Sequence, residues 1–75
     1  MQKAAYKQDF YKTLGQTLKA KRKERGLTQG EISDLLGLER SLYCRYEGGK
    51  TCIPLYDLYC LSKFYKTTIE MLLGV

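Results

Sequence analysis

The chain has 75 residues and a formal net charge of +5, with 44% hydrophobic and 28% charged residues. This composition is typical of a single soluble globular domain, and a chain this short buries only about 60% of its unfolded surface, so its core must be compact. Histidine is absent, which removes the commonest general base and the commonest metal ligand. We therefore expect no enzyme, no cofactor, no small-molecule substrate and no metal site.

Three cysteines bear on the compartment: Cys44, Cys52 and Cys60. An odd number does not fit the disulfide framework of a small secreted domain, and a structural zinc site would lack its fourth ligand. We expect free thiols. The N-terminal residues contain no apolar stretch typical of a secretory signal, and no run is long enough to span a bilayer. The sequence therefore predicts a cytoplasmic protein without a membrane partner.

Basic residues are concentrated in the first third of the chain. Residues 1–26 carry eight Lys or Arg against two acidic residues, whereas residues 27–75 carry five against six. The densest group is Lys19, Lys21, Arg22, Lys23 and Arg25. Such a group attracts the phosphates of nucleic acid or of anionic lipid. Cations in the last turn of a helix also interact with its negative end, so charge alone leaves the partner open.

The first predicted element is a helix over about residues 9–25, after an N-terminal extension over residues 1–8 that is helical, a dimer arm or flexible. Four residues at i+4 spacing share one face of this helix: Phe10, Leu14, Leu18 and Arg22. A charge in line with three apolar residues points inward, where it needs a partner.

A second helix is predicted after Thr28, because Thr28 and Glu31 have the spacing of a capping box. This helix carries three apolar residues, namely Ile32, Leu35 and Leu36, and ends at Gly37. Glycine after an apolar periodic segment is typical of a helix that ends in a left-handed residue.

The third helix is expected to begin within one residue of Glu39 and to end at Glu47. At 100° per residue, its two sides differ in polarity. The apolar side carries Leu38, Leu42, Tyr43 and Tyr46. The polar side carries Arg40, Ser41, Cys44 and Arg45.

Two further helices complete the prediction. Pro54 suits the first turn of a fourth helix, with core spacing at Leu55, Leu58, Leu61 and Tyr65. Thr67 and Glu70 have capping-box spacing before a short last helix that carries Ile69, Leu72 and Leu73. Alternation of apolar and polar residues is nowhere sustained, so the expected fold class is all-α, with five short helices.

Two short helices joined at Gly37, the second with a polar face of Arg and Ser, describe a helix-turn-helix. The segment from Leu27 to Lys50 resembles the XRE family of DNA-binding domains, the phage Cro and lambda-repressor type, and the likeness extends over about residues 14–74. The residues that carry it are Arg22, Leu27, Thr28, Gln29, Glu31, Gly37, Glu47, Gly49 and residues 69–73. The resemblance implies a compact lambda-repressor-like bundle, with residues 9–75 as the DNA-binding domain.

The resemblance also implies a role for each matching position. Arg40, Ser41 and Arg45 would face base edges in the major groove of double-stranded DNA. Thr28, Gln29 and Lys50 would contact the DNA backbone. Arg22 and Glu47 would form a structural ion pair. The alternative for the two arginines of the third helix is a solvated helix face.

The chain departs from the family pattern at Glu39, where a carboxylate near DNA repels phosphate and can draw Arg40 away from the bases. The function that follows is a sequence-specific transcriptional regulator, a repressor that binds a palindromic operator as a homodimer. The alternative is an antitoxin-like or regulatory protein-interaction module that uses aromatic residues of the fourth helix. These are Tyr56, Tyr59 and Phe64, which equally suit packing against the N-terminal extension.

Overall fold

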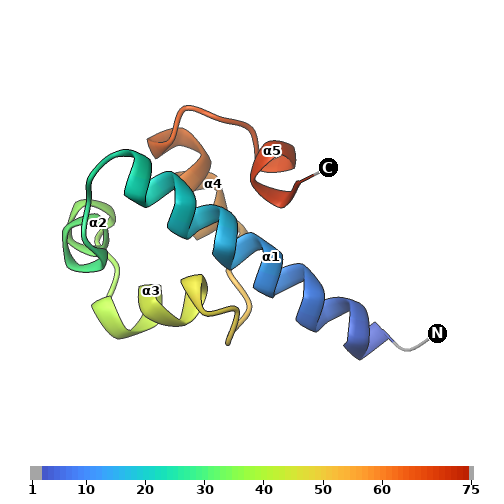
Figure 1. Cartoon of the computed structure of the whole chain (residues 1–75). Helices are drawn as coiled ribbons and strands as arrows, with labels where there is room; N and C mark the ends of the chain where they lie inside the picture. The colour runs from blue at the N-terminus through green and yellow to red at the C-terminus, as the bar shows by residue number, and fades with distance from the viewer. Residues whose placement is uncertain (1–2, 75) are drawn as a thin grey trace.

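The computed structural model describes residues 3–74, with side chains described for residues 9–74. In this part of the chain it contains five helices and no strand (Figure 1). They are α1 (Lys3–Glu24), α2 (Gln29–Leu36), α3 (Arg40–Glu47), α4 (Leu55–Phe64) and α5 (Ile69–Leu73). Helix α1 packs against α3 and α5, α2 packs against α3, and α4 packs against α5. The predicted all-α fold is confirmed.

Helix α1 is longer than its apolar periodicity predicts. It begins at Lys3 instead of about residue 9, so residues 3–8 continue the helix, while the first two residues of the predicted extension lie outside the described residues. A helix of 22 residues is about 33 Å long, close to the 39 Å longest extent of the molecule. The N-terminal half of α1 therefore projects beyond the other helices (Figure 1). Within the described residues, no helix is long and apolar enough to cross a membrane.

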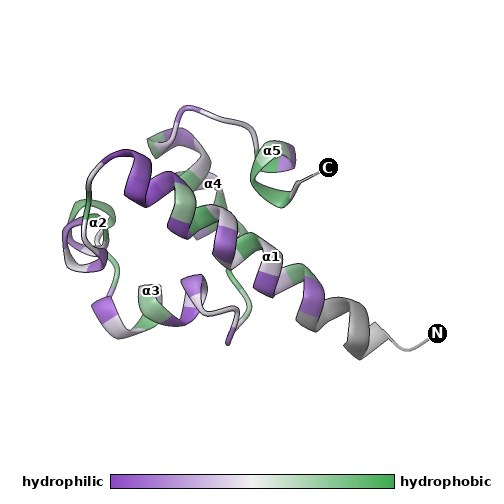
Figure 2. Ribbon diagram, viewed as in Figure 1, coloured by the Kyte–Doolittle hydropathy of each residue, from purple (hydrophilic) through white to green (hydrophobic). Residues whose placement is uncertain are grey.

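Every helix from α1 to α5 contributes to one hydrophobic core, as do the segments next to α4. The fully or nearly buried apolar residues are Leu14, Leu18, Ile32, Tyr43, Tyr46, Ile53, Leu58, Leu61, Tyr65 and Leu72. In Figure 2 green, hydrophobic residues lie on α4 and α5, whereas the C-terminal third of α1 is mostly purple, which marks hydrophilic residues. The basic end of α1 is thus held on an apolar scaffold, with Lys19 and Lys23 exposed and Arg22 buried.

Two glycines let α1 and the end of α3 lie in direct backbone contact. A Cβ on Gly15 would overlap the Glu47 carbonyl oxygen, and a Cβ on Gly49 would lie 2.7 Å from the Lys12 Cα. Gly49 also has a φ of 67°, which glycine adopts without the steric cost of a side chain. This close approach fixes the end of α3 against α1 at Glu47.

Several details of the sequence prediction are wrong. Leu55 is 74% exposed because it lies in the first turn of α4, at the edge of the core, and Phe10 is 42% exposed where α1 leaves the bundle. On α2, where no core position was assigned, Leu36 packs against the core and Leu35 is exposed. The cap of α5 is Thr68, whose hydroxyl accepts from the Met71 N–H at 3.1 Å. The helix therefore begins one residue later than a cap at Thr67 requires.

Candidate nucleic-acid interface

Helices α2 and α3 form a helix-turn-helix with well-defined ends. Thr28 caps α2, and Gly37 ends it in the left-handed conformation at φ 68°. The Leu38 N–H then donates to the Ser33 carbonyl at 2.8 Å, which closes the turn. Ser33 is buried, and its hydroxyl donates to the Gly30 carbonyl at 2.9 Å, so this polar side chain is satisfied inside the motif. The predicted boundaries of α2 and α3 are confirmed.

The two sides of α3 differ as the periodicity predicts. Tyr43 and Tyr46 are completely buried and hold the helix on the core. Arg40, Ser41 and Arg45 are exposed on the other side. A short helix anchored by two aromatic rings and presenting polar groups to solvent has the form of a reading element that enters the major groove.

The N-terminal end of α3 arranges its exposed groups in an unexpected way. Glu39 is the N-cap residue but makes no capping bond, and its Oε1 instead accepts a hydrogen bond from the Ser41 hydroxyl at 2.7 Å. The Arg40 guanidinium lies over the first turn of α2, where its Cζ would be 3.7 Å from a Cβ on Gly30. Glu39 thus holds Ser41, and the Arg40 guanidinium lies at ordinary contact distance from the position of a Cβ on Gly30.

A buried ion pair joins α1 to the end of α3. Arg22 Nε donates to Glu47 Oε2 at 2.6 Å and Arg22 Nη2 donates to Glu47 Oε1 at 3.1 Å, with the two side chains only 10% and 3% exposed. Arg22 Nη1 also donates to the Leu27 carbonyl at 2.7 Å. The inward charge of α1 thus has a partner, and the pair ties together α1, the segment before α2, and α3.

Hydrogen bonds decide the protonation state of Glu47. Burial by itself raises the pKa of this carboxyl, but its hydrogen bonds, that from Arg22 foremost, together with the Arg22 charge more than offset this effect and hold the pKa below its ordinary value. On Arg22, the hydrogen bond to Glu47 raises the pKa of the guanidinium. The pair is therefore ionised at neutral pH and stays so into mildly acidic solution.

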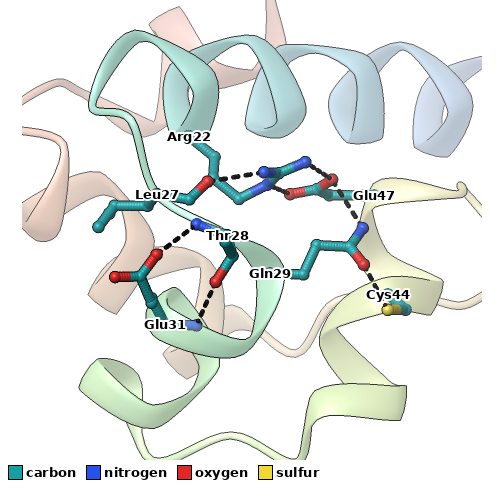
Figure 3. A network of polar contacts seen from close by, with 7 residues as sticks. All are labelled: Arg22, Leu27, Thr28, Gln29, Glu31, Cys44 and Glu47. Carbon is teal, nitrogen blue, oxygen red and sulfur yellow. Dashed lines mark hydrogen bonds and ion pairs between the residues drawn. The ribbon is translucent and has the colours of Figure 1, made fainter.

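The pair continues into a polar network that reaches α2 (Figure 3). Gln29 Nε2 donates to Glu47 Oε1 at 3.0 Å, and Gln29 Oε1 accepts from the Cys44 thiol at 2.7 Å. The side chain expected at the DNA backbone is thus held between α2 and α3 in the free chain. Cys44 was not among the predicted site residues, although its position three residues before Glu47 places both on adjoining parts of α3.

Thr28 and Glu31 form the capping box that their spacing predicts. The Glu31 N–H donates to Thr28 Oγ1 at 3.1 Å, and the Thr28 N–H donates to Glu31 Oε1 at 2.9 Å. Both hydrogen bonds with Thr28 lower the pKa of the Glu31 carboxyl, and the bond with the Thr28 backbone N–H has the larger effect. The Thr28 side chain is committed to the cap, which leaves neighbouring backbone N–H groups of the first turn as donors for an anion.

Lys50 lies at the other end of the motif. Its N–H donates to the Arg45 carbonyl at 3.0 Å, and its side chain is exposed. Gly49 brings this segment against α1 at Lys12, another exposed cation. Exposed cations thus lie at the C-terminal end of α3, while Gln29 lies at the N-terminal end of α2, so groups suited to phosphate flank the exposed face of α3.

A family profile described as a helix-turn-helix domain matches residues 15–74, which include the whole motif and Lys50. Among solved structures, the DNA-binding domain of BldD is similar with a TM-score of 0.77 and 25% identity, over 88% of this chain and 96% of that chain. The restriction-modification controller protein C.AhdI from Aeromonas hydrophila is similar with a TM-score of 0.75 and 30% identity, over 85% and 96%. Curated protein sequences yield no match.

Proposed function

The chain belongs to the XRE-type helix-turn-helix family of DNA-binding regulators, and from this membership we propose that it represses transcription by binding a palindromic operator as a homodimer. Domains of this family bind double-stranded DNA, and their fold is that of regulators, not of enzymes. The observation that carries the proposal is the arrangement of α3, in which Tyr43 and Tyr46 anchor the helix and Arg40, Ser41 and Arg45 remain exposed.

The proposed DNA contacts divide into reading and positioning groups. Arg40 and Arg45 are suited to bidentate hydrogen bonds with guanine O6 and N7, and Ser41 to a single bond with a base edge. Gln29 and Lys50, with the first-turn N–H groups after Thr28, are suited to backbone phosphates on either side. The basic end of α1 supplies the long-range attraction that the remainder of the chain lacks.

A homodimer is favoured by an apolar surface that the fold leaves uncovered. Leu55 and Tyr56 are 74% and 73% exposed, and together with Tyr59 and Ile69 they line an apolar hollow of about 580 Å³ on α4 and α5. None of these residues belongs to α2 or α3, so a second copy placed there leaves the reading helix free. A cytoplasmic location accords with the three free thiols of the chain.

The proposal is tested by selecting bound duplexes from a random pool at two salt concentrations. The expected result is an enriched palindrome whose two half-site centres are about 34 Å apart, one helical turn. The control is a variant in which Arg40 and Arg45 are both replaced by Ala, which keeps Gln29 and Lys50 and should lose enrichment before it loses affinity for random DNA. A pool that stays random through repeated rounds would refute the proposal.

A second function rests on the same apolar surface. An antitoxin-like or regulatory module would use Leu55, Tyr56 and Tyr59 to bind another protein, because aromatic groups are enriched at such interfaces. It does not need the exposed arginines of α3. This alternative therefore predicts no enriched duplex and no change in partner binding when Arg40 and Arg45 are replaced.

A further inference from the structure

A chain of side-chain hydrogen bonds crosses from α3 to the first residue of α2 and back. The Cys44 thiol donates to Gln29 Oε1, and Gln29 Nε2 donates to Glu47 Oε1, so a single carboxamide is held by two residues of α3 (Figure 3). Cys44 and Gln29 are both half-buried. The contact therefore joins two partly shielded side chains on different helices.

The two partners of Gln29 specify which way its amide faces. A carboxylate only accepts hydrogen bonds, so Glu47 requires the amide nitrogen, and a thiol is a donor that favours the amide oxygen. Both requirements are met in the same rotamer. The amide nitrogen has a second N–H for which no hydrogen-bond partner is found in the described part of the chain. That remaining N–H is the group available to an outside acceptor such as a phosphate oxygen.

The direction of the Cys44 thiol also distinguishes it from its neighbours on α3. Arg40 and Arg45 are exposed, whereas Cys44 directs its sulfur to α2 at 2.7 Å from Gln29 Oε1. Cys52, a second free thiol outside the helices, is exposed and makes no hydrogen bond that involves its side chain among the described residues. Cys44 therefore does not belong to the base-reading set, although periodicity places it on the polar side.

We propose that Cys44 is a positioning residue for DNA binding: its thiol holds the Gln29 carboxamide so that one N–H stays on Glu47 and the other faces backbone phosphate. The inference rests on the proposed function, because it gives Gln29 a phosphate to bind. It adds a residue of the reading helix that acts only through its neighbour on α2. Since phosphate carries no sequence information, Cys44 influences affinity for every duplex alike.

The test is a double-mutant cycle on DNA affinity. Cys44→Ala removes the donor, Cys44→Ser keeps one, Gln29→Ala removes the phosphate contact, and the double variant combines the two Ala changes. Cys52→Ala is the matched control, since it deletes an exposed thiol. Dissociation constants are measured for each variant with a random-sequence duplex and with the duplex enriched by selection, after thermal unfolding has shown that the variants are folded.

We expect Cys44→Ala to weaken binding to both duplexes by about 2–10-fold, the factor that one hydrogen bond is worth. Cys44→Ser should retain most of the affinity, and Cys52→Ala all of it. The double variant should bind no more weakly than Gln29→Ala alone, because Cys44 acts through Gln29. Additive losses in the double variant, or an affinity of Cys44→Ala equal to that of the unaltered chain, would overturn the proposal.

A spectroscopic measurement separates positioning from a general loss of structure. The side-chain NH2 resonances of Gln29 in the free protein should shift in Cys44→Ala and return toward their original positions in Cys44→Ser. The Thr28 and Glu31 capping resonances should stay in place. If Gln29→Ala itself binds DNA normally, the inference is overturned while the reading role of α3 stands. If the unaltered chain binds no duplex at all, the proposed function fails as well.

Discussion

Among the exposed residues of α3, the two arginines have different surroundings. The Arg40 guanidinium lies beside Gly30 on the first turn of α2, at 3.7 Å from the position of a Cβ there. Arg45 is exposed and has no side-chain hydrogen bond or ion pair with the residues that the structure describes. In this part of the chain Arg45 is therefore free of protein contacts of this kind, whereas the Arg40 side chain lies against the first turn of α2.

We predict that Arg45→Ala costs about 1–3 kcal/mol of binding free energy at the selected site and relaxes the preference at one base pair, because a bidentate contact to guanine is lost. Lys50→Ala should instead weaken binding to all duplexes and reduce the salt slope by about one unit, since a lysine contacts phosphate alone. Salt titrations with the selected and the random duplex measure both effects. Equal losses on both duplexes for Arg45→Ala would show that this residue only attracts DNA.

Glu47 should make stability depend on pH. Burial raises its pKa, but its hydrogen bonds, that from Arg22 foremost, together with the Arg22 charge more than offset this and place the pKa below the ordinary value of 4.5. A carboxyl whose pKa is lower when folded stabilises the fold above its unfolded pKa, and this stabilisation is lost as the pH falls through the folded value. We therefore expect the free energy of unfolding to fall below about pH 4.5, and Glu47→Gln to remove this part of the fall.

At neutral pH the same pair predicts a large effect of truncation. Glu47→Ala leaves the Arg22 charge buried without its partner, at a cost of about 3–5 kcal/mol, close to the whole stability of a small domain at about 5 kcal/mol. Chemical denaturation of both Glu47 variants from pH 7 to pH 3 gives the two results together. Glu24→Gln, an exposed carboxylate at the end of α1, is the control. A pH profile of Glu47→Gln that matches the unaltered chain would contradict this assignment.

Among the helices, those with local end signals were predicted well. The two ends of α2, at Thr28 and Gly37, could be predicted because a capping box and a left-handed glycine act within a few residues of the helix end. The sequence places the cap of α5 one residue early because two adjacent threonines offer the same side chain, and in the structure Thr68 is the cap. The exposure of Leu55 depends on where the other helices end, which periodicity does not contain.

The site shows the same division between local and tertiary information. An inward-facing Arg22 indicates from the sequence that a buried acceptor is needed, and the structure shows Glu47 there. The contact of Cys44 with Gln29 depends on how α2 crosses α3, and no sequence spacing of 15 residues specifies such a crossing. Likewise, the position of Arg40 over Gly30 follows from packing between two helices. Apart from the Arg22–Glu47 pair, which the family resemblance implies, contacts between helices were therefore the part that the sequence left undetermined.

Two helical glycines predict opposite effects of the same substitution. Gly15→Ala would place a Cβ against the Glu47 carbonyl oxygen and 2.7 Å from the Tyr46 carbonyl oxygen. Because this contact is with backbone, α1 must shift, and we expect a loss of about 1–3 kcal/mol despite the better helix propensity of alanine. Gly30→Ala meets only the flexible Arg40 side chain at 3.7 Å and should stabilise α2 by about 0.5 kcal/mol.

Denaturant unfolding of the two variants checks this prediction, and each serves as the control for the other. Both variants add one methyl group to a helix, so any general effect of this change on stability cancels when the two are compared. A stabilised Gly15→Ala protein would show that α1 and α3 are not in backbone contact at this point. A loss of sequence preference in Gly30→Ala would show that Arg40 needs the space beside Gly30, although a Cβ there would lie 3.7 Å from its guanidinium.

The basic surface, the proposed reading surface and the apolar surface of the chain are centred on different helices. Most cations of the first third of the chain lie on α1, the proposed reading residues on α3, and the apolar hollow on α4 and α5. Helices α3 and α5 both pack against α1, so α1 links the DNA-facing motif to the proposed dimer surface (Figure 1). One copy offers a single helix for the proposed reading of DNA. In a dimer, binding of the second copy to its half-site becomes intramolecular, which raises the overall affinity without new contacts.

We therefore predict that a charge on the apolar hollow separates the two copies and leaves each one folded. Leu55→Glu and Tyr56→Glu alter side chains that are 74% and 73% exposed, so stability should change by less than about 0.5 kcal/mol. Sedimentation should show a monomer, and footprints should shrink from two half-sites about 34 Å apart to one. In sedimentation, Leu35→Glu, which alters an exposed leucine of α2 outside the hollow, controls for added charge. A dimer that persists in both hollow variants would place the interface on another surface of the chain.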